Sequence, residues 1–287
     1  MSDKNTFFHQ KSTLNVRGTL LDLSRPKVMG IVNITPDSFY DGGETYTVGK
    51  AVAQAGRMLE EGAAIIDLGA YSSRPNAEHI STEHEIERLI PALTAILREY
   101  PQALISIDTF RSAVARAAVD EGAHIINDIS GGEMDADMFG TMADLKVPYI
   151  LMHMKGTPQT MVKEAKYTNL FEEVFQYFLE KAGKLRESGV VDVIIDPGFG
   201  FAKTADQSFE LLNKMDQFKL LELPLLAGMS RKSMICRTID VGPEDALNGT
   251  TAANTIALLK GANILRVHDV KAAAEAIKIV ERTTALS

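Results

Sequence analysis

The sequence is poor in the features that mark secreted and membrane-spanning proteins. It has one cysteine, Cys236, so it cannot form a disulfide within the chain, which agrees with a reducing compartment. It has no apolar run of about 18 residues, the length that indicates a transmembrane helix. Residues 1–6 also lack the apolar core of a signal peptide. These absences predict a cytoplasmic protein in which Cys236 is a small buried apolar residue.

Basic residues are also fewer than acidic residues. The chain has 30 Lys and Arg residues against 38 Asp and Glu residues, a formal net charge of -8. Nucleic acids and anionic membranes bind to a net or clustered basic surface. We therefore expect neither as a partner, and any anionic ligand must be bound by cations gathered locally.

Several catalytic motifs are missing as well. The sequence contains no G-x-S-x-G and no G-x-x-x-x-G-K-[ST], which argues against serine hydrolases and P-loop enzymes. It contains no H-x-x-H, H-E-x-x-H or C-x-x-C spacing, so a transition-metal site made only of protein ligands is not expected.

Short runs rich in Ile, Val and Leu alternate along the chain with longer amphipathic stretches. This pattern is typical of buried parallel strands and their crossover helices. The predicted strands are 28–34, 64–69, 104–108, 124–129, 147–153, 191–197, 225–229 and 264–267. Predicted helices include 48–61, 83–100, 111–121, 170–188 and 270–282.

Eight such units predict a single α/β domain, a (β/α)8 TIM barrel. An open doubly wound sheet is the alternative. We expect residues 28–287 to form the barrel and residues 1–27 to be an extension. Alternating apolar residues around Arg17 and Gly18 suggest that this extension is a hairpin covering the bottom of the barrel.

Polar side chains recur where the predicted strands end. In a barrel these ends face one rim, and a buried polar group costs roughly 1 to 3 kcal/mol unless it is paired. A ligand site at this rim is therefore predicted, with helix capping or internal hydrogen bonds as the plainer explanation for any single residue. The residues are Asn33, Asp67, Asp108, Asn127, Asp128, His153, Asp196, Arg266 and His268.

Cations fall in the same region and suggest a phosphate site. They are Arg74, Lys203, Arg231, Lys232 and Arg266. Glycines at 198 and 200 would let a planar ligand approach the backbone, and Phe201 would offer it an aromatic face.

Seven ordered segments resemble the signatures of dihydropteroate synthases. They are Gly30–Phe39 with Asp41–Gly43, Ser73–Pro75, Ser106–Thr109, Ile126–Asp128, Asp196–Phe201, Gly228–Ser233 and Arg266–Asp269. The resemblance covers about residues 28–285. It implies that the chain condenses 6-hydroxymethyl-7,8-dihydropterin diphosphate with 4-aminobenzoate, giving 7,8-dihydropteroate and pyrophosphate, and that it is a homodimer.

The resemblance also implies roles for individual residues. Asn33 would be a ligand of Mg²⁺, which bridges phosphates with few protein oxygens. Residues implied to bind the diphosphate are Asn33, Arg74, Arg266 and His268. Those implied to bind the pterin are Asp108, Asn127, Asp196, Lys232 and Arg266. Those implied for 4-aminobenzoate are Phe39, Ser73, Pro75, Phe201 and Ser233. The implied catalytic set is Asp41, Arg74, Lys232, Arg266 and His268.

The chain departs from the family pattern at two positions. Tyr71 stands where the family commonly has Glu, so a carboxylate is missing. Ala202 replaces a frequent glycine, which matters only if the backbone there needs a positive φ. Two rival functions are a methyltetrahydrofolate methyltransferase and a non-catalytic pterin-binding barrel. The loops that carry the cations Arg74, Lys232 and Arg266 argue against both rival functions, because neither function gives a reason for these cations.

Overall fold

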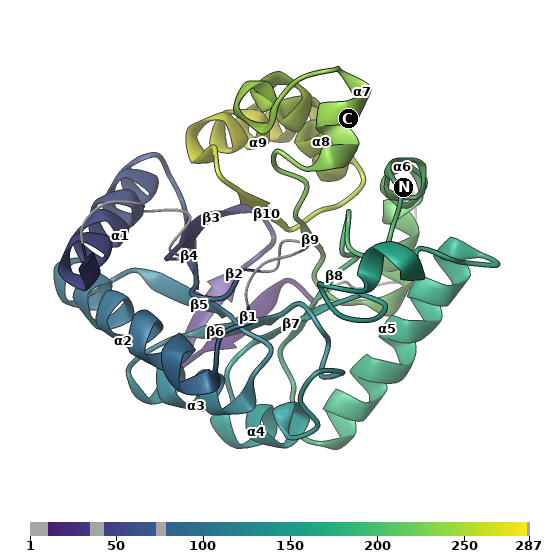
Figure 1. Cartoon of the computed structure of the whole chain (residues 1–287). Coiled ribbons are helices and arrows are strands. Elements are labelled where there is room, and N and C mark those ends of the chain that lie inside the picture. Colours follow the sequence, from purple (N-terminus) through teal and green to yellow (C-terminus); the bar gives the residue numbers. More distant parts are fainter. Residues whose placement is uncertain (1–10, 35–42, 73–78, 286–287) are drawn as a thin grey trace, which may run out of the picture.

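The computed structural model describes residues 11–34, 43–72 and 79–285. Their main feature is a ring of eight parallel strands with helices packed around it, as the view along the ring in Figure 1 shows. The strands are β3 (Lys27–Asn33), β4 (Ile65–Gly69), β5 (Leu104–Asp108), β6 (Ile125–Asp128), β7 (Tyr149–Met152), β8 (Val193–Asp196), β9 (Leu226–Ala227) and β10 (Ile264–Val267). The helices are α1 (Gly43–Glu60), α2 (Thr82–Glu99), α3 (Ser112–Asp120), α4 (Met138–Leu145), α5 (Leu170–Glu187), α6 (Ala205–Asn213), α7 (Ser233–Thr238), α8 (Leu247–Leu259) and α9 (Val270–Thr284).

The strand order shows that the sheet closes on itself. Hydrogen-bonded neighbours run in the order β8, β7, β6, β5, β4, β3, β10, β9. Ile195 in β8 bridges Leu225 just before β9, and the Ile195 N–H donates to the Pro224 carbonyl at 2.9 Å. An open doubly wound sheet would leave these two edges apart, so that alternative is wrong and the predicted barrel is confirmed.

The sequence signals place most elements correctly. Ser81 caps α2 and Asn169 caps α5, and the predicted starts of both helices lie within one residue of the observed ones. Thr204 and Gln207 form a capping box at the start of α6. The predicted strand 225–229 is wrong in length, because the pairing of β9 with β10 ends at Ala227.

The predicted N-terminal hairpin is formed by β1 (Thr13–Val16) and β2 (Thr19–Asp22). Its tight turn has positive φ at both Arg17 and Gly18, as a type I′ turn requires. Leu14, Val16 and Leu23 are almost fully buried against the first inward-facing residues of the strands. The hairpin therefore closes the bottom of the barrel, as expected.

The alternation of side chains along each strand separates two cores. Outward residues such as Ile66, Ile107 and Leu151 pack against the helices and form the larger apolar core. Inward residues line the barrel interior, whose lowest level is apolar. Among the described residues, no helix has both the length and the apolar character needed to cross a membrane.

Candidate active site

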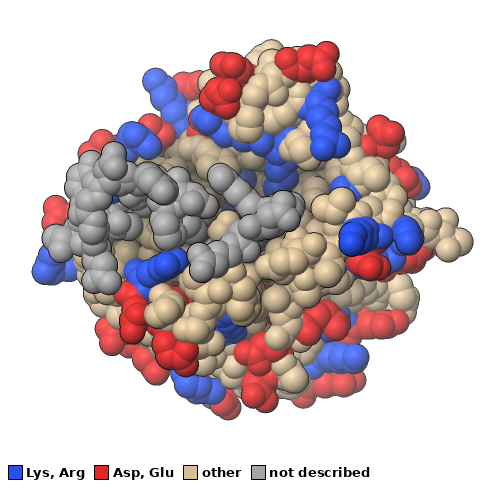
Figure 2. Space-filling model, viewed as in Figure 1, with Lys and Arg blue, Asp and Glu red and all other residues tan. Residues whose placement is uncertain are grey.

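Inside the barrel, the inward-facing side chains two residues beyond the apolar lowest level are polar. They include Asp67 from β4, Asn127 from β6, Asp196 from β8 and Arg266 from β10, all of them largely buried. Above this polar level the barrel opens into a cavity of about 620 Å³. In the view down the barrel, basic side chains lie in the hollow beside α7, whereas acidic ones are common on the periphery (Figure 2). The sequence-predicted residues that line the cavity are Asn33, Asp108, Gly200, Phe201, Arg231, Lys232, Ser233, Arg266 and His268.

Arg266 is the central cation of the site. Its Nε donates to Asp67 Oδ2 and one terminal nitrogen donates to Asp108 Oδ2, both at 2.6 Å. Asn127 Nδ2 also donates to Asp67 Oδ2, at 3.1 Å. Burial opposes the charge of Arg266, but the Asp67 and Asp108 carboxylates raise its pKa above the usual value. Arg266 therefore stays charged and keeps donors available for an anionic ligand.

Two carboxyl groups at the site have raised pKa values. Burial raises the pKa of Asp108 to about 7, against the lowering effect of Arg266. Burial also raises the pKa of Asp196, although Lys232 and the Gly198 N–H lower it. The Gly198 N–H donates to Asp196 Oδ1 at 2.8 Å, which holds the carboxylate in place. Asp196 lies beside Gly228, which lines the cavity without a side chain to cover the carboxylate.

Lys232 lies next to an aromatic face. Its Nζ donates to the Phe199 carbonyl at 2.6 Å and lies 4.7 Å from the centre of the Phe201 ring. Burial lowers the pKa of Lys232 to about 8, although Asp196 raises it. The residue follows a left-handed Arg231 (φ 56°), whose guanidinium is paired with Asp269 at 2.6 Å. This turn brings Lys232 and Ser233 from the end of β9 into the cavity.

His268 is neutral at pH 7, because burial and Arg266 lower its pKa to about 4. The Ser230 Oγ accepts the backbone N–H of His268 at 3.2 Å and lies 3.1 Å from Nδ1 of the ring. In the neutral tautomer in which the Ser230 hydroxyl donates to Nδ1, the ring proton resides on Nε2. His268 can then donate a hydrogen bond from Nε2 to an oxygen in the cavity.

Asn33 suits a cation that takes few ligands from the protein. It lies at the end of β3 and lines the cavity, and within the described residues its side chain makes no hydrogen bond. The same part of the chain contains no group of three His, Cys, Asp or Glu side chains placed to hold a metal. A single amide oxygen beside a phosphate site fits Mg²⁺, which keeps several waters and binds phosphate oxygens.

Three predicted rim residues lie elsewhere, and for these the expectation was wrong. Asp128 follows Asn127 and so points out of the barrel, where it accepts from Tyr149 Oη at 2.6 Å and from Ser130. His153 and Lys203 are buried together, with Lys203 Nζ 2.8 Å from His153 Nδ1.

Lys203 also donates to the carbonyls of Gly198 and Phe201, so its ammonium group holds the chain after β8, and it is not among the residues that line the cavity. His153 borders a separate hollow of about 1260 Å³ beside α5. This hollow contains none of the other predicted site residues.

Five predicted site residues lie outside the described residues. They are Phe39, Asp41, Ser73, Arg74 and Pro75.

Some residues at the cavity had no assigned role. Asp67 lies at a predicted strand end, and the structure shows that it is the shared acceptor for Arg266 and Asn127. Tyr71, Ser72 and Met161 line the cavity, and Met161 comes from a connection with no sequence signal. Ala202 has φ 48°, so this backbone does require the left-handed region, and the departure from glycine there matters.

The comparisons with known proteins identify the family of the chain. Residues 29–268 match the family model described as pterin binding enzyme. The dihydropteroate synthase of Escherichia coli (strain K12) is 44% identical over 276 residues, covering 94% of this chain and 96% of that protein.

Solved structures give the same result. A Yersinia pestis dihydropteroate synthase with a sulfonamide drug superposes with a TM-score of 0.89 at 39% identity, covering 95% of this chain and 99% of that one. The Xanthomonas albilineans enzyme in complex with 7,8-dihydropteroate superposes with a TM-score of 0.86 at 37% identity, and the match covers 95% of this chain and 99% of that one.

Proposed function

Because the chain belongs to the dihydropteroate synthase family of pterin-binding enzymes, we propose that the cavity above Arg266 joins a pterin diphosphate to 4-aminobenzoate. The observation that carries the proposal is the set of groups at the strand ends: a charged Arg266 and a neutral His268 line one cavity, and the buried carboxylate of Asp196 lies at the polar level below it. The rival methyl transfer involves no diphosphate and gives no reason for these cations. A non-catalytic barrel is disfavoured because Lys232 and Arg266 are both retained at the cavity.

The reaction breaks the bond between the pterin methylene carbon and a diphosphate oxygen. The nitrogen of 4-aminobenzoate forms the new bond to that carbon and loses a proton, and pyrophosphate leaves. Since the diphosphate takes the bonding electrons, stabilising its growing charge is the main task of the protein. Arg266 uses two of its five N–H donors on Asp67 and Asp108, so three remain for phosphate oxygens. The Nε2–H of His268 supplies a further donor.

The pterin is held at the polar level of the barrel. Asp196 accepts two hydrogen bonds from the pterin N3 and 2-amino edge, and Asp108 and Asn127 complete this contact. Lys232 donates toward the pterin carbonyl, and Arg266 adds a stacking contact on the ring face. The 4-aminobenzoate lies higher, between Phe201 and Ser233, both of which line the cavity. Asp41 and Arg74, together with Phe39, Ser73 and Pro75, complete the proposed set from the family resemblance.

Asn33 is the proposed protein ligand of Mg²⁺. When bound, the ion would neutralise part of the diphosphate charge as it leaves. The proposal is supported by the position of Asn33 at the end of β3, where it lines the cavity together with Arg266 and His268.

We also propose a cytoplasmic homodimer. The exposed apolar side chains of α8 support the dimer, because Ile256 and Leu259 are 45% and 56% exposed, and Ile239, which lies near Gly249 of the same helix, is 41% exposed. Grouped apolar side chains of this kind are typical of an interface. The single, buried Cys236 supports a reducing compartment.

The test is pyrophosphate release from the pterin diphosphate, measured with and without 4-aminobenzoate. Release and 7,8-dihydropteroate formation should both require the amine, EDTA should abolish them and Mg²⁺ should restore them. A sulfonamide should compete with 4-aminobenzoate. Turnover at full rate in EDTA would contradict the role of Asn33, and the absence of the pteroate product would contradict the proposed reaction.

A further inference from the structure

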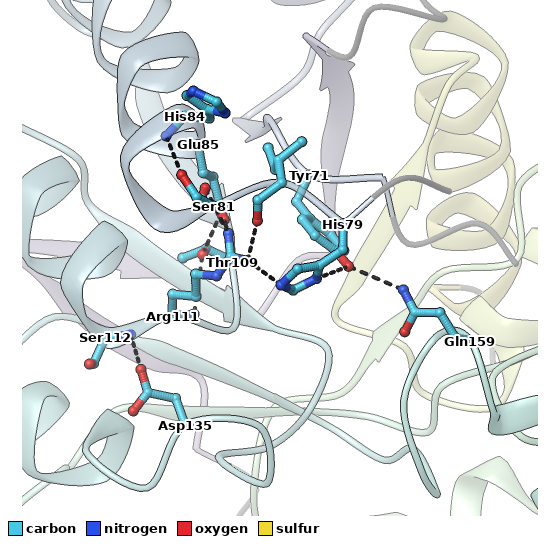
Figure 3. Close-up of polar contacts among 11 residues, drawn as sticks. Tyr71, His79, Ser81, His84, Glu85, Thr109, Arg111, Ser112, Asp135 and Gln159 are labelled. Atoms are coloured by element: carbon cyan, nitrogen blue, oxygen red, sulfur yellow. Dashed lines mark hydrogen bonds and ion pairs between the residues drawn. The ribbon is translucent and has the colours of Figure 1, made fainter. Parts of the chain in front are cut away.

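A hydrogen-bond network lies at the mouth of the cavity, around Tyr71 in the connection after β4. Figure 3 shows the Tyr71 hydroxyl between His79 and Gln159, and Arg111 reaching toward His79. Tyr71 Oη lies 3.2 Å from His79 Nδ1 and accepts from Gln159 Nε2 at 3.2 Å. The network thus joins the connection after β4 to the one after β7.

Arg111 fixes one end of this network. It is paired with Glu85, whose carboxylate is fully buried and also accepts from Thr109 Oγ1 at 2.7 Å. The guanidinium donates to the Ile80 carbonyl at 2.6 Å and to the Ser81 carbonyl at 3.3 Å. A terminal nitrogen of the guanidinium also lies 3.4 Å from His79 Nε2. A buried ion pair therefore sets the position of the His79 ring.

The contact with Arg111 determines which ring nitrogen carries the proton. Arginine has no acceptor, so His79 Nε2 accepts and Nδ1 carries the hydrogen. Nδ1 then donates to Tyr71 Oη, which accepts from Gln159 as well. With both lone pairs of Oη occupied, the hydroxyl hydrogen of Tyr71 has no acceptor among the described residues and can donate to a ligand.

The Tyr71 ring is held rigidly. It is 8% exposed, packs edge-to-face on Phe110 at 5.0 Å between ring centres, and belongs to an apolar cluster with Met161 and Phe201. Tyr71 and Phe201 both line the cavity. Tyr71 also comes two residues after Gly69, which pairs with Asp108, so it lies further from the barrel bottom than Asp196 and Asn127.

We propose that Tyr71 donates its hydroxyl hydrogen to the carboxylate of the aromatic amine bound at the mouth of the cavity. The inference rests on the proposed function and adds a binding residue that selects an anionic amine. His79, Gln159 and Arg111 act as positioning residues, because they orient the hydroxyl without touching the substrate.

The experiment compares the wild-type chain with Tyr71→Phe, which keeps the ring and removes the hydroxyl. The KM for 4-aminobenzoate should rise about tenfold, since a hydrogen bond to a charged group is lost. The KM for the neutral amide 4-aminobenzamide should change less than threefold. Calorimetric affinity for the pterin diphosphate should be unchanged, because the pterin is bound at the lower level and neither Arg266 nor His268 hydrogen-bonds to Tyr71.

Two further variants separate binding from structure. Gln159→Ala should raise the KM for 4-aminobenzoate less than Tyr71→Phe, and the double variant should match Tyr71→Phe alone. Tyr177→Phe is the matched control: its hydroxyl donates to the Met152 carbonyl at 3.0 Å, and it lies outside the cavity lining. It should leave both KM values unchanged.

An unchanged KM in Tyr71→Phe, or equal losses for the acid and the amide, would overturn the assignment. A wild-type chain without turnover would instead contradict the proposed function. In that case, titration of 4-aminobenzoate into both proteins with pterin and pyrophosphate present still decides the role of Tyr71.

Discussion

The bottom and the mouth of the barrel are formed by the same strands but have opposite chemistry. At the bottom, inward residues such as Met29, Ile65 and Ile194 are apolar and are covered by Leu14 of the hairpin. Two residues further along β4 and β8, about 7 Å higher, the inward residues are Asp67 and Asp196. The lower level stabilises the fold by apolar burial, whereas the upper level places charges where they are costly to bury.

The upper level retains signs of this cost. Asp67 Oδ1 and Ser106 Oγ are buried without a hydrogen-bond partner among the described residues. The carboxyls of Asp108 and Asp196 have raised pKa values because burial disfavours their charged forms. We infer that stability depends mainly on the bottom of the barrel and function on its mouth. Five predictions test this contrast.

Removing the central cation should have the largest effect. Arg266→Ala leaves Asp67 and Asp108 buried without their counter-charge, so we expect a loss of about 3 to 5 kcal/mol in unfolding free energy and no measurable turnover. Urea denaturation and pyrophosphate release measure the two effects. Arg116→Ala is the control, because its pair with Asp144 is exposed and should contribute under about 1 kcal/mol. Equal effects in the two variants would contradict the role of Arg266.

Damage to the bottom should reduce stability alone. Leu14→Ala opens a space beneath the fully buried lower level and should cost about 2 to 4 kcal/mol. The kcat and both KM values, measured well below the melting temperature, should stay within twofold of the wild type. A raised KM would show that the hairpin also influences the mouth.

Asp196→Asn should have the opposite result to Leu14→Ala, reducing function without reducing stability. The amide keeps the shape but turns a donor toward the pterin donors, so pterin affinity should fall at least tenfold, about 1.4 kcal/mol. Folding raises the pKa of Asp196, so its ionised form destabilises the protein at neutral pH and the neutral amide should not lower stability. Calorimetry and thermal melts provide both readouts. Unchanged pterin binding would exclude the carboxylate as the pterin acceptor.

The charge of Lys232 should appear in the pH profile. Its pKa of about 8 means that it is charged below this pH and neutral above it. We expect kcat/KM for the pterin diphosphate to fall about tenfold by pH 9, because this ratio reports groups of the free enzyme. Lys232→Arg keeps the charge and should move the decline to higher pH. A flat profile from pH 7.5 to 9.5 in the wild type would rule out a role for this charge.

The smallest effect is expected at Ala202. Its φ of 48° is strained for alanine, and glycine would relieve this strain while losing a buried methyl group. We expect Ala202→Gly to change the unfolding free energy by less than about 0.5 kcal/mol. The control Ala115→Gly, inside α3, should cost about 1 kcal/mol or more. Equal losses would indicate that Ala202 is not strained.

Much of the fold could be predicted from local patterns. A strand is recognisable from its Ile and Val residues, and successive strands joined by a crossover helix lie side by side in a parallel sheet. The barrel follows from these two rules, and the alternating apolar residues around Arg17 and Gly18 predict the hairpin at its bottom. Ordered motifs also placed Arg266, Lys232 and His268 at one rim. The position of Asp128 and His153 at strand ends led to the wrong prediction that they face the site. A shift of one residue along a strand turns a side chain to the opposite face.

The sequence by itself determined the fold class, the order of the strands and the types of residue at their ends, because these depend on periodicity and composition. Only the tertiary structure decided how these groups pair. Asp67 is the shared acceptor of Arg266 and Asn127, although the three residues are far apart in the chain. Tyr71 meets Gln159 across two connections, and nothing local to either residue encodes that contact. Such pairings depend on the closure of the barrel, which brings distant strand ends to one rim.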